Sequence, residues 1–454
     1  MRKVIHELLP AESDLEGLGH EMHALVAELY PICRSITGNG VRETLGRLQR
    51  FIPLTVHEVP SGTRVFDWTV PLEWNIRDAY IKNSRGERVI DFQKSNLHVV
   101  SYSTPLHKKM RLEELRSHLF SLPDNPDWVP YRTSYYKRDW GFCLTHKQLL
   151  DLSEDEYEVC IESSLESGHL TYGEFYVRGE SSEEILISAH VCHPSLANDN
   201  LSGIAVACFL AKRISQLRRK YSYRFLFAPG TIGAITWLSI NESTAHQIKH
   251  GLVLAGVGDA GSLTYKKSRR GNTDIDRAAT LAICETESKS QTLDFTPYGY
   301  DERQYCSPGF NLAVGRLSRT PHGTFPEYHT SADNVSFVRP DSLGESLSVC
   351  LHVVSILEQN RTYLNTNPKC EPQLGERNLY QSLGGGSDNK ATELAMLWVL
   401  NLSDGKQSLL EIAERSHLRF EVIVRAANAL KEHGLLEEVS AQSLPRSTER
   451  QFAN

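Results

Sequence analysis

The stretch SAHVCHPSLANDNLSG, residues 188–203, decides the fold of this 454-residue chain. The apolar run EILI precedes it and the run IAVACFLAKRI follows it, so the pattern predicts a buried strand, a loop and a helix. The loop carries two imidazoles, a thiol and a carboxylate, those of His190, Cys192, His193 and Asp199. Because ligands of open α/β sheets bind beyond the carboxyl ends of the strands, we expect a functional site at this loop.

Strand-like and helix-like runs alternate from residue 140 to residue 365. Examples are EYEVCIES, LTYGEFYVRG, YRFLFAP, GAITWLSIN and GLVLAGVGD. Strands that alternate with helices in this way are typical of an α/β domain. The sequence therefore predicts a mostly parallel sheet with helices on both faces.

The flanking segments have other patterns. Residues 14–52 keep apolar residues at helical spacing, and residues 55–135 consist of short apolar and aromatic runs separated by turns such as NSRG. Residues 391–440 indicate a helix, a turn, a helix and a final strand, which is typical of a winged helix. We predict an N-terminal helical part of the α/β domain at 1–54, an inserted all-β domain at 55–135, the α/β domain at 136–370 and a winged-helix domain at 371–454.

The composition argues against several classes of protein. A formal net charge of −7 disfavours a binder of nucleic acid or of an anionic membrane. Within residues 391–440, eight acidic side chains outnumber five basic ones, so we expect the winged helix to contact protein, including another copy of the chain, rather than a duplex. Nine cysteines without a CxxC pair indicate reduced thiols and a cytoplasmic location. No stretch approaches 18 apolar residues, so no membrane span is predicted.

Four side chains have the chemistry of metal ligands, since zinc is held by imidazole nitrogen and carboxylate oxygen. They are His190 at the end of EILISAH, Asp199 before the helix, Asp259 in LVLAGVGDAG and His329 in EYHTSADN. Taken singly, each has a simpler interpretation as a surface histidine, a helix cap or a turn residue. Together they lie at or after predicted strand ends, where they can converge on one ion.

The motifs HVCHPSLANDNLSG, GVGDAG and EYHTSADN resemble, in this chain order, those of the zinc aminopeptidase and glutaminyl-cyclase-like superfamily. The chain is more similar still to bacterial proteins with an aminopeptidase-like domain that are associated with polysaccharide biosynthesis. The strings LYPICRSITGNGVRETL, VFDWTVPLEWNIRDAYI and DERQYCSPGFNL carry that resemblance, which spans residues 20–440. It implies a zinc-peptidase-like core, an inserted β domain and a C-terminal winged helix.

The resemblance also implies roles for individual residues. His190 would bind zinc, Asp199 would bridge the metals of dinuclear relatives, Asp259 would be the second carboxylate ligand and His329 the distal imidazole. His193 is either an alternative to His190 as ligand or its neighbour in the site.

The chain departs from the superfamily at two positions. Pro229, Gly230 and Thr231 stand where the relatives have a Glu-Glu pair, and Cys192 replaces the Asp of an HxD triplet. The pair supplies a ligand and the proton acceptor, so we expect one zinc ion here rather than two, and a different general base.

Two further segments offer replacements. YGYDERQYCSPGF contains Asp301 and Glu302, and we expect Glu302 to be the base, the alternative being a surface turn or an ion pair with Arg303. YKKSRRGNTDIDRA offers Arg269 and Arg270, whose guanidinium groups suit an anionic substrate. The candidate substrate-binding residues are Arg269, Arg270, Asp301, Arg303 and Tyr328.

The leading hypothesis is a zinc-dependent hydrolase that cleaves an amide bond in a small peptide or an acylated amino sugar. The alternative is a metal-containing binding or assembly protein that has lost hydrolysis together with the Glu-Glu pair. A transcription regulator is disfavoured by the acidic winged helix.

Overall fold

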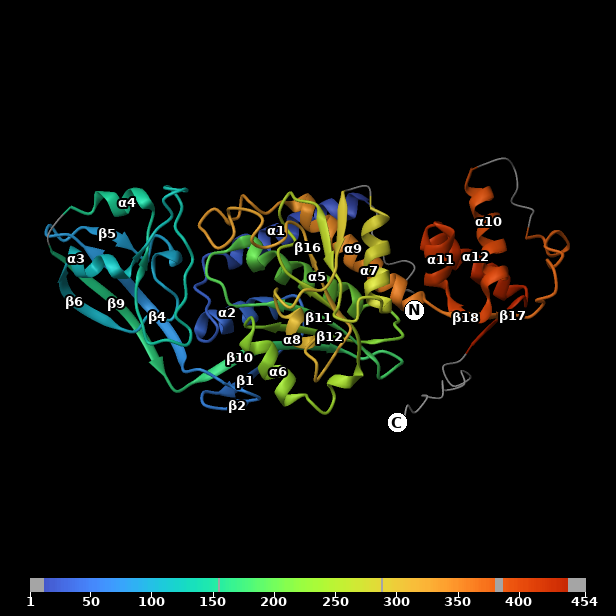
Figure 1. Cartoon of the computed structure of the whole chain (residues 1–454), viewed down its shortest axis with the longest axis horizontal. Helices are drawn as coiled ribbons and strands as arrows, with labels where there is room; N and C mark the ends of the chain where they lie inside the picture. Colours follow the sequence, from blue (N-terminus) through green and yellow to red (C-terminus); the bar gives the residue numbers. More distant parts are fainter. Residues whose placement is uncertain (1–11, 154–155, 287–288, 380–386, 440–454) are drawn as a thin grey trace, which may run out of the picture. The chain divides into compact units, whose positions relative to one another are not determined.

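The computed structural model describes residues 12–153, 156–286, 289–379 and 387–439 (Figure 1). The chain forms two compact units, Met1–His352 and Val353–Asn454. Within the described residues, no helix is long and apolar enough to cross a membrane.

The first unit is built on an eight-stranded sheet, which confirms the predicted mostly parallel α/β core. The four central strands, in the order β12, β11, β13 and β16, all run parallel, and antiparallel pairs flank them. From edge to edge the strands are β1 (Thr55–Pro60), β10 (His169–Val177), β12 (Ser222–Ala228), β11 (Glu184–His190), β13 (Ile248–Leu254), β16 (Val314–Ser318), β14 (Leu263–Lys266) and β15 (Ser290–Leu293).

Helices cover both faces of this sheet, and α5 and α6 lie on opposite sides of β11 and β12 (Figure 1). The first turn of α5 approaches β13 so closely that a side chain at Gly203 would collide with the Leu254 carbonyl oxygen. The helices of this unit are α1 (Glu12–Leu29), α2 (Asn39–Leu48), α3 (Leu112–Leu115), α4 (His146–Asp151), α5 (Gly203–Ser215), α6 (Ile232–Ile240), α7 (Asp274–Cys284), α8 (Glu302–Tyr305) and α9 (Pro340–Gln359), which continues into the second unit.

A four-stranded antiparallel sheet forms the predicted β insertion. Its order is β5 (Arg88–Asp91), β4 (Glu73–Lys82), β9 (Glu156–Glu166) and β6 (Leu106–Arg111), and the NSRG segment turns between β4 and β5. Two strands differ from the predicted range 55–135 of this insertion. β9 belongs to it but comes after residue 135, and β1, at the start of that range, belongs to the main sheet. Two smaller pairs are β2 (Arg64–Val65) with β3 (Trp68–Thr69), and β7 (Leu119–Phe120) with β8 (Phe142–Cys143).

The second unit is a winged helix, as the sequence predicts. Ser408 caps α11 by accepting a hydrogen bond from the Glu411 backbone N–H, and apolar residues such as Ile412 and Ile423 form its core. Its elements are β17 (Thr362–Asn365), α10 (Ser387–Leu402), β18 (Asp404–Ser408), α11 (Leu409–Ser416), α12 (Phe420–Glu432) and β19 (Leu436–Glu438), with β17 in the middle of the three-stranded sheet.

Candidate metal centre

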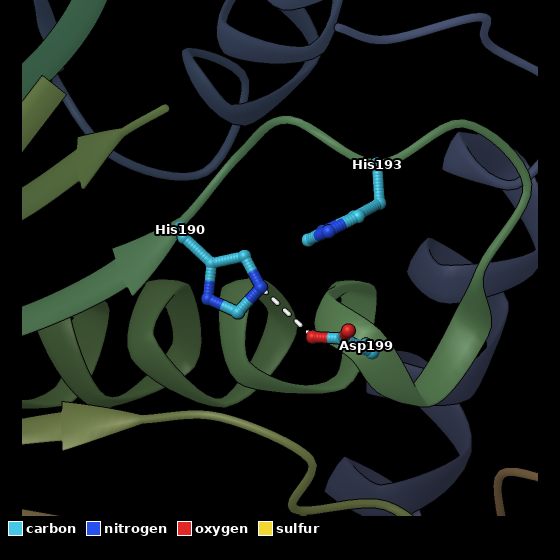
Figure 2. A group of neighbouring side chains, drawn as sticks. All are labelled: His190, His193 and Asp199. Carbon is cyan, nitrogen blue, oxygen red and sulfur yellow. Dashed lines mark hydrogen bonds and ion pairs between the residues drawn. The ribbon is translucent and has the colours of Figure 1, made fainter. Parts of the chain in front are cut away.

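His190 and Asp199 meet at the carboxyl end of β11. His190 is the last residue of that strand, and its Nε2 donates a hydrogen bond of 2.8 Å to Oδ1 of Asp199 (Figure 2). Asp199 lies in the single turn Ala197–Ser202 that leads into α5. Both side chains are almost fully buried, at 2% and 1% exposure. The strand–loop–helix motif therefore folds back and brings two potential ligands together.

Two more imidazoles face the same carboxylate. His329 Nε2 is 3.0 Å from Asp199 Oδ2, so each carboxylate oxygen faces a different histidine. One ligand atom each from His190, His193 and Asp199 lies within 4.8 Å of the others, and Figure 2 shows both rings turned toward Asp199. The ring centroid of His193 is 5.1 Å from those of His190 and His329. Both histidines that the sequence left as alternatives thus belong to one group.

The charges of this group suit a bound cation. Burial alone would raise the pKa of Asp199, but the three imidazoles hold it well below its usual range. Burial lowers the pKa of His193 to about 3, with Asp199 opposing that shift and the other two histidines adding to it. A neutral imidazole beside an ionised carboxylate is the protonation state that metal coordination requires. The donor set, imidazole nitrogen and carboxylate oxygen, is one that zinc accepts.

Asp333 holds the backbone at Asn198 and Asp199, and Asp259 holds the Asn198 side chain. The Asp333 carboxylate accepts hydrogen bonds from the backbone N–H groups of Asn198 and Asp199, at 2.6 and 3.0 Å. Asp259 accepts one of 2.9 Å from the Asn198 side chain and another of 2.6 Å from the Thr320 hydroxyl. Within the described chain, Asp259 therefore accepts hydrogen bonds from protein donors, and the group that meets within 4.8 Å consists of His190, His193 and Asp199 and contains neither Asp259 nor His329.

Aromatic rings form the walls of a cavity of about 240 Å³ over the histidines. Tyr300 stacks on His190 and Tyr328 on His329, with ring centroids 5.0 and 3.9 Å apart. Tyr131 packs edge-on against His329, with centroids 5.1 Å apart, and its backbone N–H donates to the His329 carbonyl oxygen. The segment between β7 and β8 thus covers the site.

Gly230 and Thr231 line this cavity. A side chain at Gly230 would start 3.3 Å from the His190 Cβ and 3.6 Å from the Cys192 Sγ. A carboxylate side chain at position 230 would therefore start beside His190. Burial raises the pKa of Cys192 well above its usual range, so its thiol stays protonated.

Asp301, rather than Glu302, faces the cavity. Asp301 lines it, is 3% exposed, and its Oδ1 has no hydrogen-bond partner among the described residues. Burial raises the pKa of Asp301 to about 7, with the charge of His190 opposing the shift. Glu302 is instead paired with Lys266 at 2.9 Å and lies 3.7 Å from Arg316. Two buried cations thus hold the Glu302 carboxylate away from the cavity lining, although its Oε2, like the Asp301 Oδ1, has no hydrogen-bond partner among the described residues.

The arginines expected to clamp a substrate lie elsewhere. Arg269 and Arg270 are exposed, and Arg269 donates a hydrogen bond of 2.9 Å to Asn311. Neither of them nor Arg303 lines the cavity in the described part of the chain, whereas Arg132 does. Of the predicted substrate-binding residues, the structure brings Asp301 and Tyr328 to the cavity.

The cavity is also lined by three residues that the sequence did not predict, Tyr131, Arg132 and Tyr300. For Tyr300, its position next to Asp301 was a signal in the sequence, whereas Tyr131 reaches the site through a pairing of Pro130 with Thr330. That contact joins segments 200 residues apart, which no local pattern reveals.

Two family matches cover most of the chain. A family described as a domain of unknown function (DUF4910) matches residues 23–360, and one described as winged helix-turn-helix matches residues 361–438.

Individual relatives agree with these matches. A Clostridium acetobutylicum protein named polysaccharide biosynthesis protein with aminopeptidase-like domain is 56% identical over 421 residues, 93% of this chain and 97% of that protein. A crystal structure from the same organism, described as a peptidase, has 53% identity and a TM-score of 0.91, covering 96% of this chain and 100% of that one. A zinc aminopeptidase from Bacillus subtilis shares the fold, with 11% identity, a TM-score of 0.54 and coverage of 74% and 94%.

Proposed function

This chain belongs to the family described as a domain of unknown function (DUF4910), and we propose that it is a zinc-dependent hydrolase that cleaves an amide bond in a small substrate. One observation carries the proposal. Three imidazoles surround the carboxylate of Asp199, and a second carboxyl group, with a pKa of about 7, lines the same cavity. A hydrolytic metal site requires this combination of ligands and proton acceptor.

Three of the four side chains of His190, His193, Asp199 and His329 would hold the ion, so that one position of a tetrahedral zinc stays open for water. When bound, zinc supplies a Lewis acid that polarises a carbonyl group and activates water. One ion is favoured over two, because Gly230 and Thr231 bring no carboxylate to the cavity. Asp259 would act through Asn198, whose side chain it fixes.

Asp301 would take the role of general base. Its side chain lines the cavity, and a pKa of about 7 allows the carboxylate to accept a proton from the attacking water and to return it to the leaving amine. The rings of Tyr131, Tyr300 and Tyr328 exclude bulk water and orient the substrate.

The cavity of about 240 Å³ favours a short acyl or sugar group over a long peptide. The name of the Clostridium relative, which refers to polysaccharide biosynthesis, adds support for an acylated amino sugar. We propose a cytoplasmic location, in keeping with nine free cysteines. The acidic winged helix would contact protein, either a partner or a second copy of the chain, and salt-sensitive binding of a DNA duplex by the whole protein would contradict this.

Metal content and turnover of the purified protein test the hydrolase proposal. We expect one zinc per chain by mass spectrometry, and release of a free amine from N-acetyl amino sugars or aminoacyl anilides. Asp301→Asn should retain zinc and lose turnover, whereas Asp294→Asn, an exposed carboxylate paired with Lys267, should behave as the native chain. Stoichiometric zinc without turnover on either substrate class would favour the alternative, a binding or assembly protein.

A further inference from the structure

A second cavity lies in the first unit, between the β2–β3 hairpin and the helices α6 and α8. Its volume is about 630 Å³, and it shares no lining residue with the cavity at the metal centre. α6 packs against both β2 and α8, so parts far apart in the sequence build one wall (Figure 1). Small-molecule sites typically measure about 300–1,000 Å³, so this cavity can hold a ligand of several rings.

Aromatic rings line this cavity without being buried. Phe66 and Trp68 are 42% and 41% exposed, although large aromatic side chains are usually covered. The Phe66 ring packs edge-on against Phe310, with centroids 5.8 Å apart, and Trp68 packs in the same way against Tyr136 at 5.3 Å. Val65, fully buried, anchors the hairpin. The rings are thus held in place while part of their apolar surface stays open to a ligand.

The polar lining is rich in hydrogen-bond acceptors and poor in cations. Asp67, Glu242 and Gln304 bring carboxylate and amide groups, and His246 brings an imidazole. The Arg64 guanidinium lies 3.3 Å from the Asp67 carboxylate. No such ion pair is recorded for the Glu242 carboxylate among the described residues. No lysine or arginine is among the lining residues in the described chain. A phosphate or carboxylate ligand would meet repulsion here, whereas hydroxyl groups would find acceptors.

We propose that this cavity binds a neutral oligosaccharide. The apolar C–H face of a pyranose ring matches the open faces of Trp68 and Phe66, and sugar hydroxyls can donate hydrogen bonds to Glu242 and Gln304. A lipid would leave the polar groups unpaired, and a nucleotide or phosphosugar would bring the wrong charge. The site is separate from the metal centre, so it does not depend on hydrolase activity.

Calorimetric titration of the zinc-loaded full-length protein tests this proposal. The probes are cellohexaose, chitohexaose and maltohexaose as neutral chains, and a heparin hexasaccharide as an anionic one. We expect at least one neutral chain to bind with Kd below about 1 mM and the heparin chain not to bind. Trp68→Ala should weaken binding at least ~10-fold, as loss of a central aromatic contact does. The control is Tyr176→Ala, an aromatic residue on β10 that is 42% exposed against 41% for Trp68, and it should leave binding unchanged.

Three results would overturn the proposal: no neutral chain binding with Kd below about 1 mM, binding that Trp68→Ala leaves intact, or preferential binding of heparin. Zinc content reports on the metal centre separately and should stay at the native value in Trp68→Ala. If that variant does not fold, Glu242→Ala, at an exposed position, gives the same test, with the same expected weakening.

Discussion

The Arg34 side chain donates a hydrogen bond of 2.9 Å from its Nε to the main-chain oxygen of His193. Arg34 is 1% exposed and also donates to the Leu29 carbonyl oxygen at 2.7 Å. Burial lowers the pKa of Arg34 to about 10, so it stays charged near neutral pH. A buried cation thus fixes the turn that carries a candidate zinc ligand.

Replacing Arg34 should loosen this turn. We expect Arg34→Met to lower the free energy of unfolding by about 2–4 kcal/mol, because the Leu29 and His193 carbonyl oxygens lose their donor. Zinc affinity should fall as well, since His193 is no longer held. Urea denaturation and competition with a chelator measure the two effects. Arg50→Met, at a 51% exposed surface pair with Glu28, is the control and should change neither.

The role of Asp259 can be separated from that of a direct ligand. Because Asp259 reaches the centre only through Asn198, we expect Asp259→Asn to weaken zinc binding by about 10–100-fold, the usual effect of an outer-shell partner. His329→Ala removes a nitrogen 3.0 Å from Asp199 and should weaken it further. Chelator titrations of both variants make the comparison. Equal loss in the two would mean that Asp259 coordinates the ion directly.

The activity should depend on pH through Asp301. Its pKa of about 7 means that the carboxylate needed for proton acceptance is lost as the pH falls below 7. We expect kcat/KM to rise about tenfold per pH unit below the pKa and to level off above it. Asp301→Asn should abolish this limb along with most of the turnover. If the residual activity of Asp301→Asn still falls below pH 7, the pH dependence belongs to another group.

The stability should change with pH in the opposite direction. The pKa of Asp301 is about 7 in the folded chain against an ordinary 3.8, so the folded state binds this proton more tightly. The contribution to stability is therefore complete below about pH 4 and is lost as the pH rises through 7. Burial raises the pKa of Asp333 to about 7 as well, so it acts in the same direction.

Urea denaturation of metal-free protein at pH 5 and pH 8 measures this effect. Asp301→Asn should reduce the difference in unfolding free energy between the two pH values by ~2 kcal/mol, leaving the part due to Asp333. Asp294→Asn should leave the difference unchanged.

Glu302 should matter for folding rather than for chemistry. Glu302→Gln leaves the Lys266 and Arg316 cations without a full counter-charge in a buried site, which typically lowers stability by about 3–5 kcal/mol. The folded fraction should retain turnover, because Asp301 is untouched. Thermal unfolding measures the loss of stability, and rates divided by the concentration of folded protein measure the turnover. Loss of turnover in fully folded Glu302→Gln would return the role of base to Glu302.

Much of the site could be predicted from the sequence because its parts are local. An apolar run that ends in His190, followed by Asp199 and a helical run, places both residues at a strand end by pattern alone. His329 could be identified from its motif, but its 3.0 Å contact with Asp199 joins positions 130 residues apart. That contact depends on how the strands order themselves in the sheet.

The sequence by itself determined the alternation of strands and helices in the α/β core and the types of ligand, since hydrophobic periodicity and residue chemistry are local properties of the sequence. Only the tertiary structure decided which of two adjacent carboxyl groups faces the cavity. Asp301 and Glu302 are neighbours at the start of α8, yet Glu302 meets Lys266 from β14 while Asp301 meets the cavity beside His190. Burial and partners brought from distant strands set the charge of each group, and neither is visible in a single segment.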